Sequence, residues 1–208
     1  AWSRGLGDVY KRQSIESDSD DDLDVNELLD DAASMLDATA ECMITRVVKA
    51  CGLPNIAENI RRLPKPLRLG CGCSGSGIWS WSGSSVAAGL ASATMEPVET
   101  EHVFTCDSGV AQQQWLCEST HTRACCCFKD VAHLSRDKAP CVKHGTDCSV
   151  QDVHMFSDGF SCTSVSGYNE QSSDSRMALA DPESTLATAV TWRGTLEYLK
   201  TKRPAMVL

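Results

Sequence analysis

From residue 67 onward, short apolar runs alternate with longer segments whose apolar residues recur at helical spacing. Runs of the first kind predict strands, and segments of the second kind predict helices. Strands are expected at residues 67–69, 102–106, 124–128, 153–156 and 205–208, and helices at residues 78–91, 111–119 and 194–200. Strands that alternate with helices along a chain are typical of an α/β fold with a parallel sheet.

The first third of the chain has a different character. The run from Asp8 to Gln13 resembles the translation of a sequencing adapter, and we set it aside as derived from library construction. Residues 14–24 are acidic and poor in apolar side chains, so disorder is expected there, followed by a short amphipathic helix over residues 25–42. Pro64 and Pro66 then mark a boundary. The expected divisions are an adapter-like segment, an acidic leader with its linker, and a folded domain, at residues 1–13, 14–66 and 67–208.

Charge and cysteine content narrow the class of protein. The chain has 28 acidic residues against 19 Lys and Arg, but 11 of the acids lie in residues 14–41. From Cys42 onward acids and bases are equal in number, which neither favours nor excludes a nucleic-acid partner. No run of 18 apolar residues and no secretory pattern occurs, so we expect no membrane partner. The twelve cysteines include the consecutive residues 125–127, a poor disulfide framework, and this favours reduced thiols in an intracellular protein.

Glycines and acids follow the expected strands at positions typical of a nucleotide site. Gly70, Gly72 and Gly75 satisfy the spacing of the dinucleotide-binding turn directly after the first strand. Asp107 closes the next strand, where an acid accepts hydrogen bonds from ribose hydroxyls, and Asp130 follows the third. Together these features favour a cofactor that contains adenosine.

A cysteine lies just beyond the expected strand at residues 153–156. That strand leads into Asp158 and Gly159, and Cys162 follows within the same loop. A thiol on a glycine-bearing loop at a strand end is well placed for nucleophilic attack on a substrate in the cofactor cleft. Cys162 is therefore the candidate nucleophile.

The order of these motifs resembles that of the cytosine-5 DNA methyltransferases. Residues 73–77 (CSGSG) are similar to the F-x-G-x-G turn that holds S-adenosylmethionine, and residues 102–107 resemble the strand whose terminal acid binds the ribose. Residues 128–131 (FKDV) resemble the segment whose aspartate contacts adenine. Residues 159–166 (GFSCTSVS) are similar to the G-F-P-C-Q-x-F-S loop of the catalytic cysteine, and residues 194–208 to the lead-in to the E-N-V motif.

The resemblance implies a Rossmann-like methyltransferase sheet, S-adenosylmethionine as cofactor, and DNA with a flipped-out cytosine as partner. The Cys162 thiolate would attack C6 of the cytosine, so that C5 accepts the methyl group. The localisation implied is intracellular, and nuclear in a eukaryote. The implied cofactor-binding residues are Cys73, Gly75, Gly77, Asp107, Ser108, Asp130 and Val131.

The sequence also departs from the family pattern. Ser161 replaces the usual proline, Thr163 the glutamine and Cys73 the phenylalanine, and the chain ends at Leu208, just before the expected E-N-V glutamate. We therefore expect a fragment of a catalytic domain that is inactive as it stands. The alternatives are a tRNA cytosine-5 methyltransferase, a degenerate module that binds cofactor or nucleic acid without catalysis, and a nicotinamide-dependent dehydrogenase.

A second group of metal-ligating residue types falls between the motifs. Cys141, His144 and Cys148, with Cys127 or His133 nearby, offer three or four ligands of the kind that zinc prefers. Their spacing is imperfect and no second CxxC pair completes the set. The expectation here is a solvated loop without a metal.

Overall fold

The computed structural model describes residues 25–75, 77–119, 123–159 and 181–208, and residues 36–208 form one compact unit. The adapter-like residues and the acidic run that ends at residue 24 lie outside the described residues. In chain order the elements are α2 (Val25–Cys51), α3 (Leu53–Arg61), β1 (Leu67–Gly72), α4 (Ile78–Thr94), β2 (Thr100–Cys106), α5 (Val110–Glu118), β3 (Cys126–Phe128), the 3-10 turn η1 (Val131–His133), β4 (Lys138–Cys141), β5 (Thr146–Ser149), β6 (Met155–Asp158), α7 (Ala187–Lys202) and β7 (Met206–Val207).

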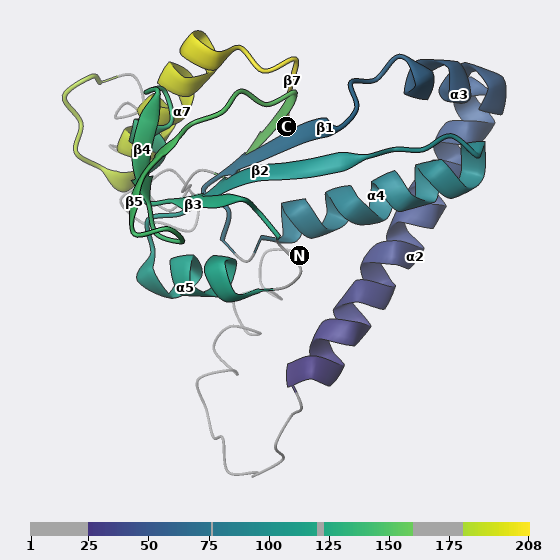
Figure 1. Ribbon diagram of the computed structural model, residues 1–208, viewed down its shortest axis with the longest axis horizontal. Helices are drawn as coiled ribbons and strands as arrows, with labels where there is room; N and C mark the ends of the chain where they lie inside the picture. Colours follow the sequence, from purple (N-terminus) through teal and green to yellow (C-terminus); the bar gives the residue numbers. More distant parts are fainter. Residues whose placement is uncertain (1–24, 76, 120–122, 160–180) are drawn as a thin grey trace, which may run out of the picture. The chain divides into compact units, whose positions relative to one another are not determined.

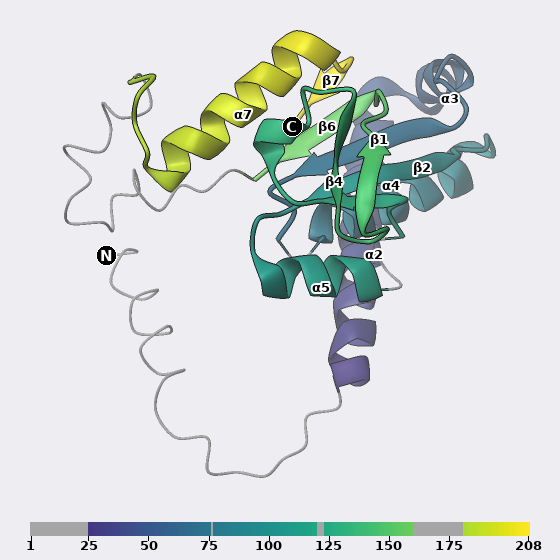
Figure 2. The same ribbon diagram turned by 60° about the vertical axis from the view of Figure 1, so that its left-hand side comes forward.

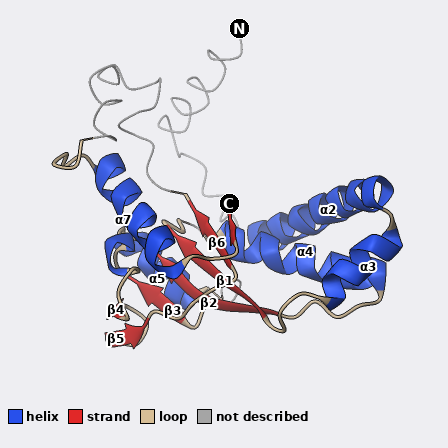
Figure 3. Cartoon of the chain, turned by 90° about the horizontal axis from the view of Figure 1, so that it is seen from above, coloured by secondary structure: helices blue, strands red, loops and turns tan. Residues whose placement is uncertain are grey.

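The strands form one mixed sheet of seven strands in the order β5-β4-β3-β2-β1-β6-β7. The five strands from β3 to β7 in this order are mutually parallel, and β4 and β5 add an antiparallel hairpin at one edge (Figures 1 and 3). The chain proceeds outward from β1 to β3 and then returns to β6 on the other side of β1. This reversal of strand order is compatible with a Rossmann-like fold.

Helices cover both faces of the parallel strands, α4 and α5 on one face and α7 on the other (Figures 1 and 2). On the α7 face, the ring of Tyr198 lies 4.3 Å from that of Phe156 and 6.0 Å from that of Phe104, measured between centroids. The Phe104 ring also meets Phe128 edge to face. These four aromatic side chains are fully buried, and they form the centre of the hydrophobic core.

Two glycines allow close packing on the α7 face. A Cβ on Gly70 in β1 would lie 2.6 Å from the Phe104 ring, so the ring occupies the space that a side chain would need. A Cβ on Gly194 in α7 would lie 2.9 Å from the backbone nitrogen of Ala132 in η1. The absence of these side chains lets the core ring and the helix approach the backbone.

The expected α/β pattern is confirmed, with differences at several elements. The helix expected over residues 25–42 extends to Cys51, and the helix expected at 194–200 covers Ala187–Lys202. The region around Cys141–Cys148 is the β4–β5 hairpin and not the expected loop, and α3 was not anticipated. None of the described helices combines the length and the apolar character needed to cross a lipid bilayer.

Candidate functional site

Four loops begin at the carboxyl edge of the parallel strands, where open α/β sheets bind their ligands. They follow β1, β2, β3 and β6, and they start at Cys73, Asp107, Lys129 and Gly159. Neighbouring loop starts are joined through the backbone, since Asp107 N donates to Phe128 O at 3.2 Å and Gly159 N to Gly72 O at 3.4 Å. The point where the strand order reverses lies between β1 and β6.

The glycine turn after β1 is tied to the end of β2. Gly75 and Gly77 have φ values of 54° and 76°, in the left-handed region that glycine adopts without strain. The Ser74 hydroxyl accepts from Cys106 N at 3.1 Å, and Ser74 N donates to Cys106 O at 2.7 Å. The turn is therefore held at the strand end by buried hydrogen bonds and leads directly into α4.

Asp107 connects the glycine turn with the loop after β2. Its Oδ2 accepts from Gly75 N at 2.8 Å and its Oδ1 from Gly109 N at 2.9 Å. Each carboxylate oxygen has two acceptor sites, so both can take a further hydrogen bond from a ligand hydroxyl. The side chain of Gln113 also donates to the Asp107 carbonyl at 2.7 Å. The structure thus brings together Gly75 and Asp107, which are 32 positions apart in sequence.

An open pocket lies beside this contact. Its volume is about 310 Å³, and it is lined by Gly75, Ala111, Gln112 and Trp115. The half-buried indole of Trp115 provides an aromatic wall from α5. Sequence reasoning missed Trp115. An aromatic side chain in the helix that follows the loop after β2 could have indicated this wall of the pocket.

The other residues predicted to bind the cofactor lie at the same edge of the sheet, but their environments differ. Asp130 Oδ1 accepts from Ala132 N at 2.9 Å and so caps η1. Val131 is buried in the core, and its side chain packs against the position of Gly194. Ser108 is exposed. Of these three residues, Asp130 and Ser108 therefore present polar side chains near the edge, whereas Val131 contributes to packing.

Asp158 is a charged group whose environment the sequence did not reveal. It closes β6 beside Gly72 of β1, and burial raises the pKa of its carboxyl, while the hydrogen bond from the Thr195 hydroxyl opposes the rise. Its Oδ1 is buried and has no hydrogen-bond partner within the described part of the chain. Cys73 is half-buried next to it, and burial together with the Asp158 carboxylate raises the pKa of its thiol.

The candidate nucleophile Cys162 lies outside the described residues, as do Ser161 and Thr163. The described chain before it ends at Gly159, next to Gly72 and the backbone oxygen of Cys73. The described chain thus reaches the reversal point between β1 and β6 at Gly159, three residues before Cys162.

A separate cluster of metal-ligating side chains lies on β3 and the hairpin. The Sγ atoms of Cys126, Cys141 and Cys148 and the ring nitrogen of His144 all lie within 4.8 Å of one another. Cys126 was not among the predicted ligands. Its neighbour Cys127 points to the opposite face of the sheet and is buried. No other group of three or more such residues converges in the described ranges.

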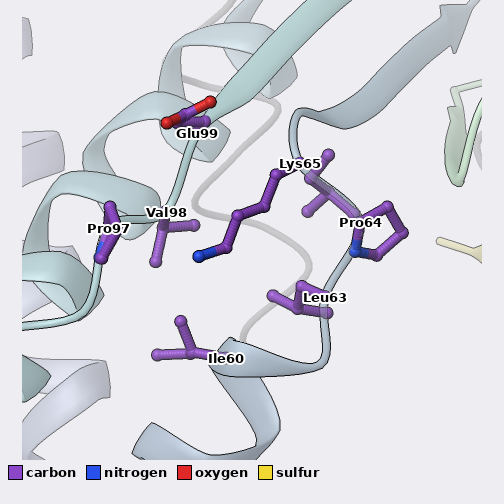
Figure 4. A pocket seen from close by; sticks show the side chains of 8 residues that line it. Ile60, Leu63, Pro64, Lys65, Pro97, Val98 and Glu99 are labelled. Carbon is purple, nitrogen blue, oxygen red and sulfur yellow. The ribbon is translucent and has the colours of Figure 1, made fainter.

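A small pocket at the opposite edge of the sheet has a different character. It lies near the amino ends of β1 and β2 and is lined mainly by apolar side chains, among them Ile60, Leu63 and Val98, and the Lys65 side chain extends across it (Figure 4). The space left between these side chains is too small to admit a water molecule, so this pocket does not compete with the carboxyl edge as a ligand site.

Neither known family models nor curated proteins provide a relative from which a function could be transferred. No model of a known protein family matches the chain, and a search of curated proteins yields no significant match. Any statement about function therefore depends on the geometry of the carboxyl edge and on the sequence motifs.

Proposed function

We propose that this domain binds S-adenosylmethionine at the carboxyl edge of its sheet and methylates C5 of cytosine in DNA, with Cys162 as the nucleophile. The observation that carries the proposal is the contact of Gly75 N with the Asp107 carboxylate at 2.8 Å, beside the pocket walled by Trp115. It joins the glycine turn, the strand-end acid and an aromatic surface in one place.

The residues present fit the adenosine part of the cofactor. A Cβ on Gly75 would meet nothing within 4 Å, so open space lies above the turn. Asp107 would accept from the ribose hydroxyls, and Trp115 offers a flat apolar surface for the adenine ring. The pocket of about 310 Å³ is within the size range of small-molecule sites. When bound, S-adenosylmethionine supplies an electrophilic methyl group.

The chain's own part in the chemistry is covalent catalysis. The Cys162 thiolate forms a bond to C6 of the flipped-out cytosine, which makes C5 nucleophilic, and it leaves again when the C5 proton is lost after methylation. A free thiol has a pKa of about 8.5, so Cys162 must lose its proton as the substrate binds. Gly159 is the last described residue before it, and three residues of chain span at most about 11 Å. The proposal therefore requires the Cys162 thiol to lie within reach of a ligand at the reversal point between β1 and β6.

Calorimetry tests the cofactor. The protein is titrated with S-adenosylhomocysteine and, separately, with NAD. We expect binding of S-adenosylhomocysteine and a loss of about tenfold or more in affinity for Asp107→Asn, because a hydrogen bond to a charged group contributes about 1.5–3 kcal/mol. Asp152→Asn is the matched control, since Asp152 is an exposed acid near the amino end of β6. Binding of NAD alone would identify a nicotinamide site and overturn the proposal.

Covalent trapping tests the reaction. Oligonucleotides that contain 5-fluorocytosine block release of the cysteine after methyl transfer. With S-adenosylmethionine present, such DNA should form an adduct with the full-length protein that survives denaturation and disappears in Cys162→Ala. Cys117→Ala should leave the adduct intact. An adduct with transfer RNA but not with DNA would assign the RNA substrate. Binding of S-adenosylhomocysteine without any adduct would assign a cofactor-binding module that does not catalyse.

A further inference from the structure

The hairpin at the edge of the sheet brings together four ligand side chains, one from β3 and three from the hairpin itself. Cys126 begins β3, Cys141 ends β4, His144 lies in the turn, and Cys148 is in β5. The pairing of β4 with β5 sets Cys148 opposite Ala139 and Cys141 opposite Thr146. The backbone, rather than the side chains alone, therefore determines that these groups converge.

The distances from the imidazole nitrogen to the three sulfurs are those expected of ligands around one metal ion. Nδ1 of His144 lies 3.2 Å from the Cys148 sulfur, 3.4 Å from the Cys141 sulfur and 3.8 Å from the Cys126 sulfur. A tetrahedral zinc ion, with bonds of about 2.3 Å to sulfur and about 2.0 Å to nitrogen, separates such ligands by about 3.6 Å. The three observed distances bracket this value.

Hydrogen bonding does not explain the convergence. One imidazole nitrogen is either a single donor or a single acceptor, so it satisfies one thiol and leaves two without a strong partner. Cys141 is buried and Cys126 and Cys148 are half-buried, so the three sulfurs have limited access to water. A cation shared by all four groups accounts for the arrangement.

The turn that carries His144 is also built to hold the hairpin against β3. Val142 N donates to Cys127 O at 2.7 Å, and the Lys143 ammonium donates to Ala124 O at 2.6 Å. Gly145 has a φ of 67° and donates its N–H to Cys141 O at 3.0 Å, which closes the turn. These hydrogen bonds fix the turn and so hold the His144 imidazole beside the three thiols. None of them uses a thiol or the imidazole.

We infer that Cys126, Cys141, His144 and Cys148 form a structural zinc site that fastens the β4–β5 hairpin to β3. Three thiolates and one imidazole in a tetrahedral arrangement select zinc among the common divalent ions. Four protein ligands complete the coordination sphere, so the ion has a structural and not a catalytic role. The inference is independent of the function proposed above, because none of the four ligands lies at the carboxyl-edge pocket.

The test begins with the metal content of the protein, purified under reducing conditions and with oxygen excluded. Elemental analysis should find one zinc ion per chain. Replacement by Co²⁺ should give the visible absorption of a tetrahedral cobalt site together with a thiolate charge-transfer band. Folded protein, as judged by circular dichroism, that contains no zinc and gives no such spectrum would overturn the inference.

Variants then identify the ligands. Cys148→Ser and His144→Ala should lose most of the bound zinc, and His144 is exposed, so its truncation leaves the core intact. Cys125→Ser is the matched control, because Cys125 is an exposed thiol next to Cys126 and is not part of the cluster. Equal loss of zinc in the control, or a disulfide between two of the three ligand thiols in mass spectrometry, would overturn the assignment.

Discussion

At the scale of single residues, Asp158 has the least favourable environment near the carboxyl edge. Its buried Oδ1 has no hydrogen-bond partner among the described residues, and its other oxygen accepts from Thr195. Burial raises its pKa, which means that the folded protein holds the proton more tightly than the unfolded chain does. Such a group contributes stability at low pH and loses it as the pH rises through the folded-state pKa.

We expect Asp158→Asn to raise the free energy of unfolding at pH 7, because the neutral amide avoids the cost of burying a charged carboxylate. Near about pH 2, well below the ordinary pKa of an aspartate, the carboxyl is protonated in both states and the difference between variant and wild type should be smallest. Urea denaturation across this pH range measures the difference, with the exposed Asp152→Asn as control. A variant that is less stable than wild type at pH 7 would contradict this account.

Tyr198 supplies a second prediction at this scale. Its hydroxyl is buried, and within the described ranges it has no hydrogen-bond partner, while its ring packs on Phe104 and Phe156. Tyr198→Phe keeps the ring contacts and removes the unsatisfied group. The variant should be as stable as wild type or up to about 1 kcal/mol more stable in urea denaturation. A loss of more than about 1 kcal/mol would reveal a partner for the hydroxyl.

At the scale of elements, α7 is positioned by its close approach to η1. Glycine inside a helix normally costs about 1 kcal/mol relative to alanine, so Gly→Ala in a helix is expected to stabilise. At Gly194 the new Cβ would lie 2.9 Å from the backbone of Ala132, and backbone cannot move away cheaply. The sign of the effect should therefore reverse at this position.

Gly194→Ala should destabilise the protein by about 1–3 kcal/mol, the usual cost of overpacking. Gly83→Ala in α4 is the matched control, because its Cβ would make an ordinary contact with Leu69 at 3.4 Å. That variant should gain up to about 1 kcal/mol. Thermal or urea denaturation measures the change in the free energy of unfolding for both variants. Equal changes would show that α7 does not approach η1 closely.

The hairpin shows most clearly what the sequence could not predict. The parallel strands were found because their apolar runs are distinct, but β4 and β5 (KAPC and TDCS) are short and carry few β-branched or aromatic side chains. Helix α3 was missed although Pro54 lies near its start, where proline is tolerated. The ligand Cys126 was missed because three consecutive cysteines do not show which thiol faces the hairpin. Only the alternation of side chains in β3 separates Cys126 from the buried Cys127.

At the scale of the whole molecule, the carboxyl edge depends on the complete sheet. The loops after β1, β2, β3 and β6 come from separate parts of the chain, and the sequence predicted that they would meet because parallel strands place their carboxyl ends together. It did not predict the pocket wall at Trp115 or the buried carboxyl at Asp158. Those features depend on how a helix packs and on how deeply a strand end is buried, and neither is encoded in a local motif.

Ligand binding should therefore stabilise the domain as a unit. S-adenosylhomocysteine at a hundred times its dissociation constant should add about 2.7 kcal/mol to the free energy of unfolding. Thermal denaturation with increasing ligand measures this as a rise in Tm, and Asp107→Asn should require more ligand for the same rise. An unchanged Tm at saturating ligand would contradict binding to the folded state.

Removal of zinc should loosen the β4–β5 edge of the sheet and leave its centre unchanged. A chelator should speed hydrogen exchange of the amides in β4 and β5, while exchange in β1 and β2 stays close to that of the untreated protein. The reason is that β4 pairs with β3 only around Phe128 and Cys141, whereas β1 is paired on both sides. Uniform acceleration across the sheet would show that the ion supports the whole domain and not the hairpin.

The run of three cysteines also has a consequence for how the chain finds its native alignment. Moving β3 by a single position along its neighbours would turn Cys126 inward and send another thiol to the hairpin side. Because Cys125 or Cys127 would then occupy the place of Cys126, the set of four metal ligands would remain complete. The same shift would turn the Phe128 ring away from Phe104, so burial of this ring, and not the metal, selects the native pairing of β3.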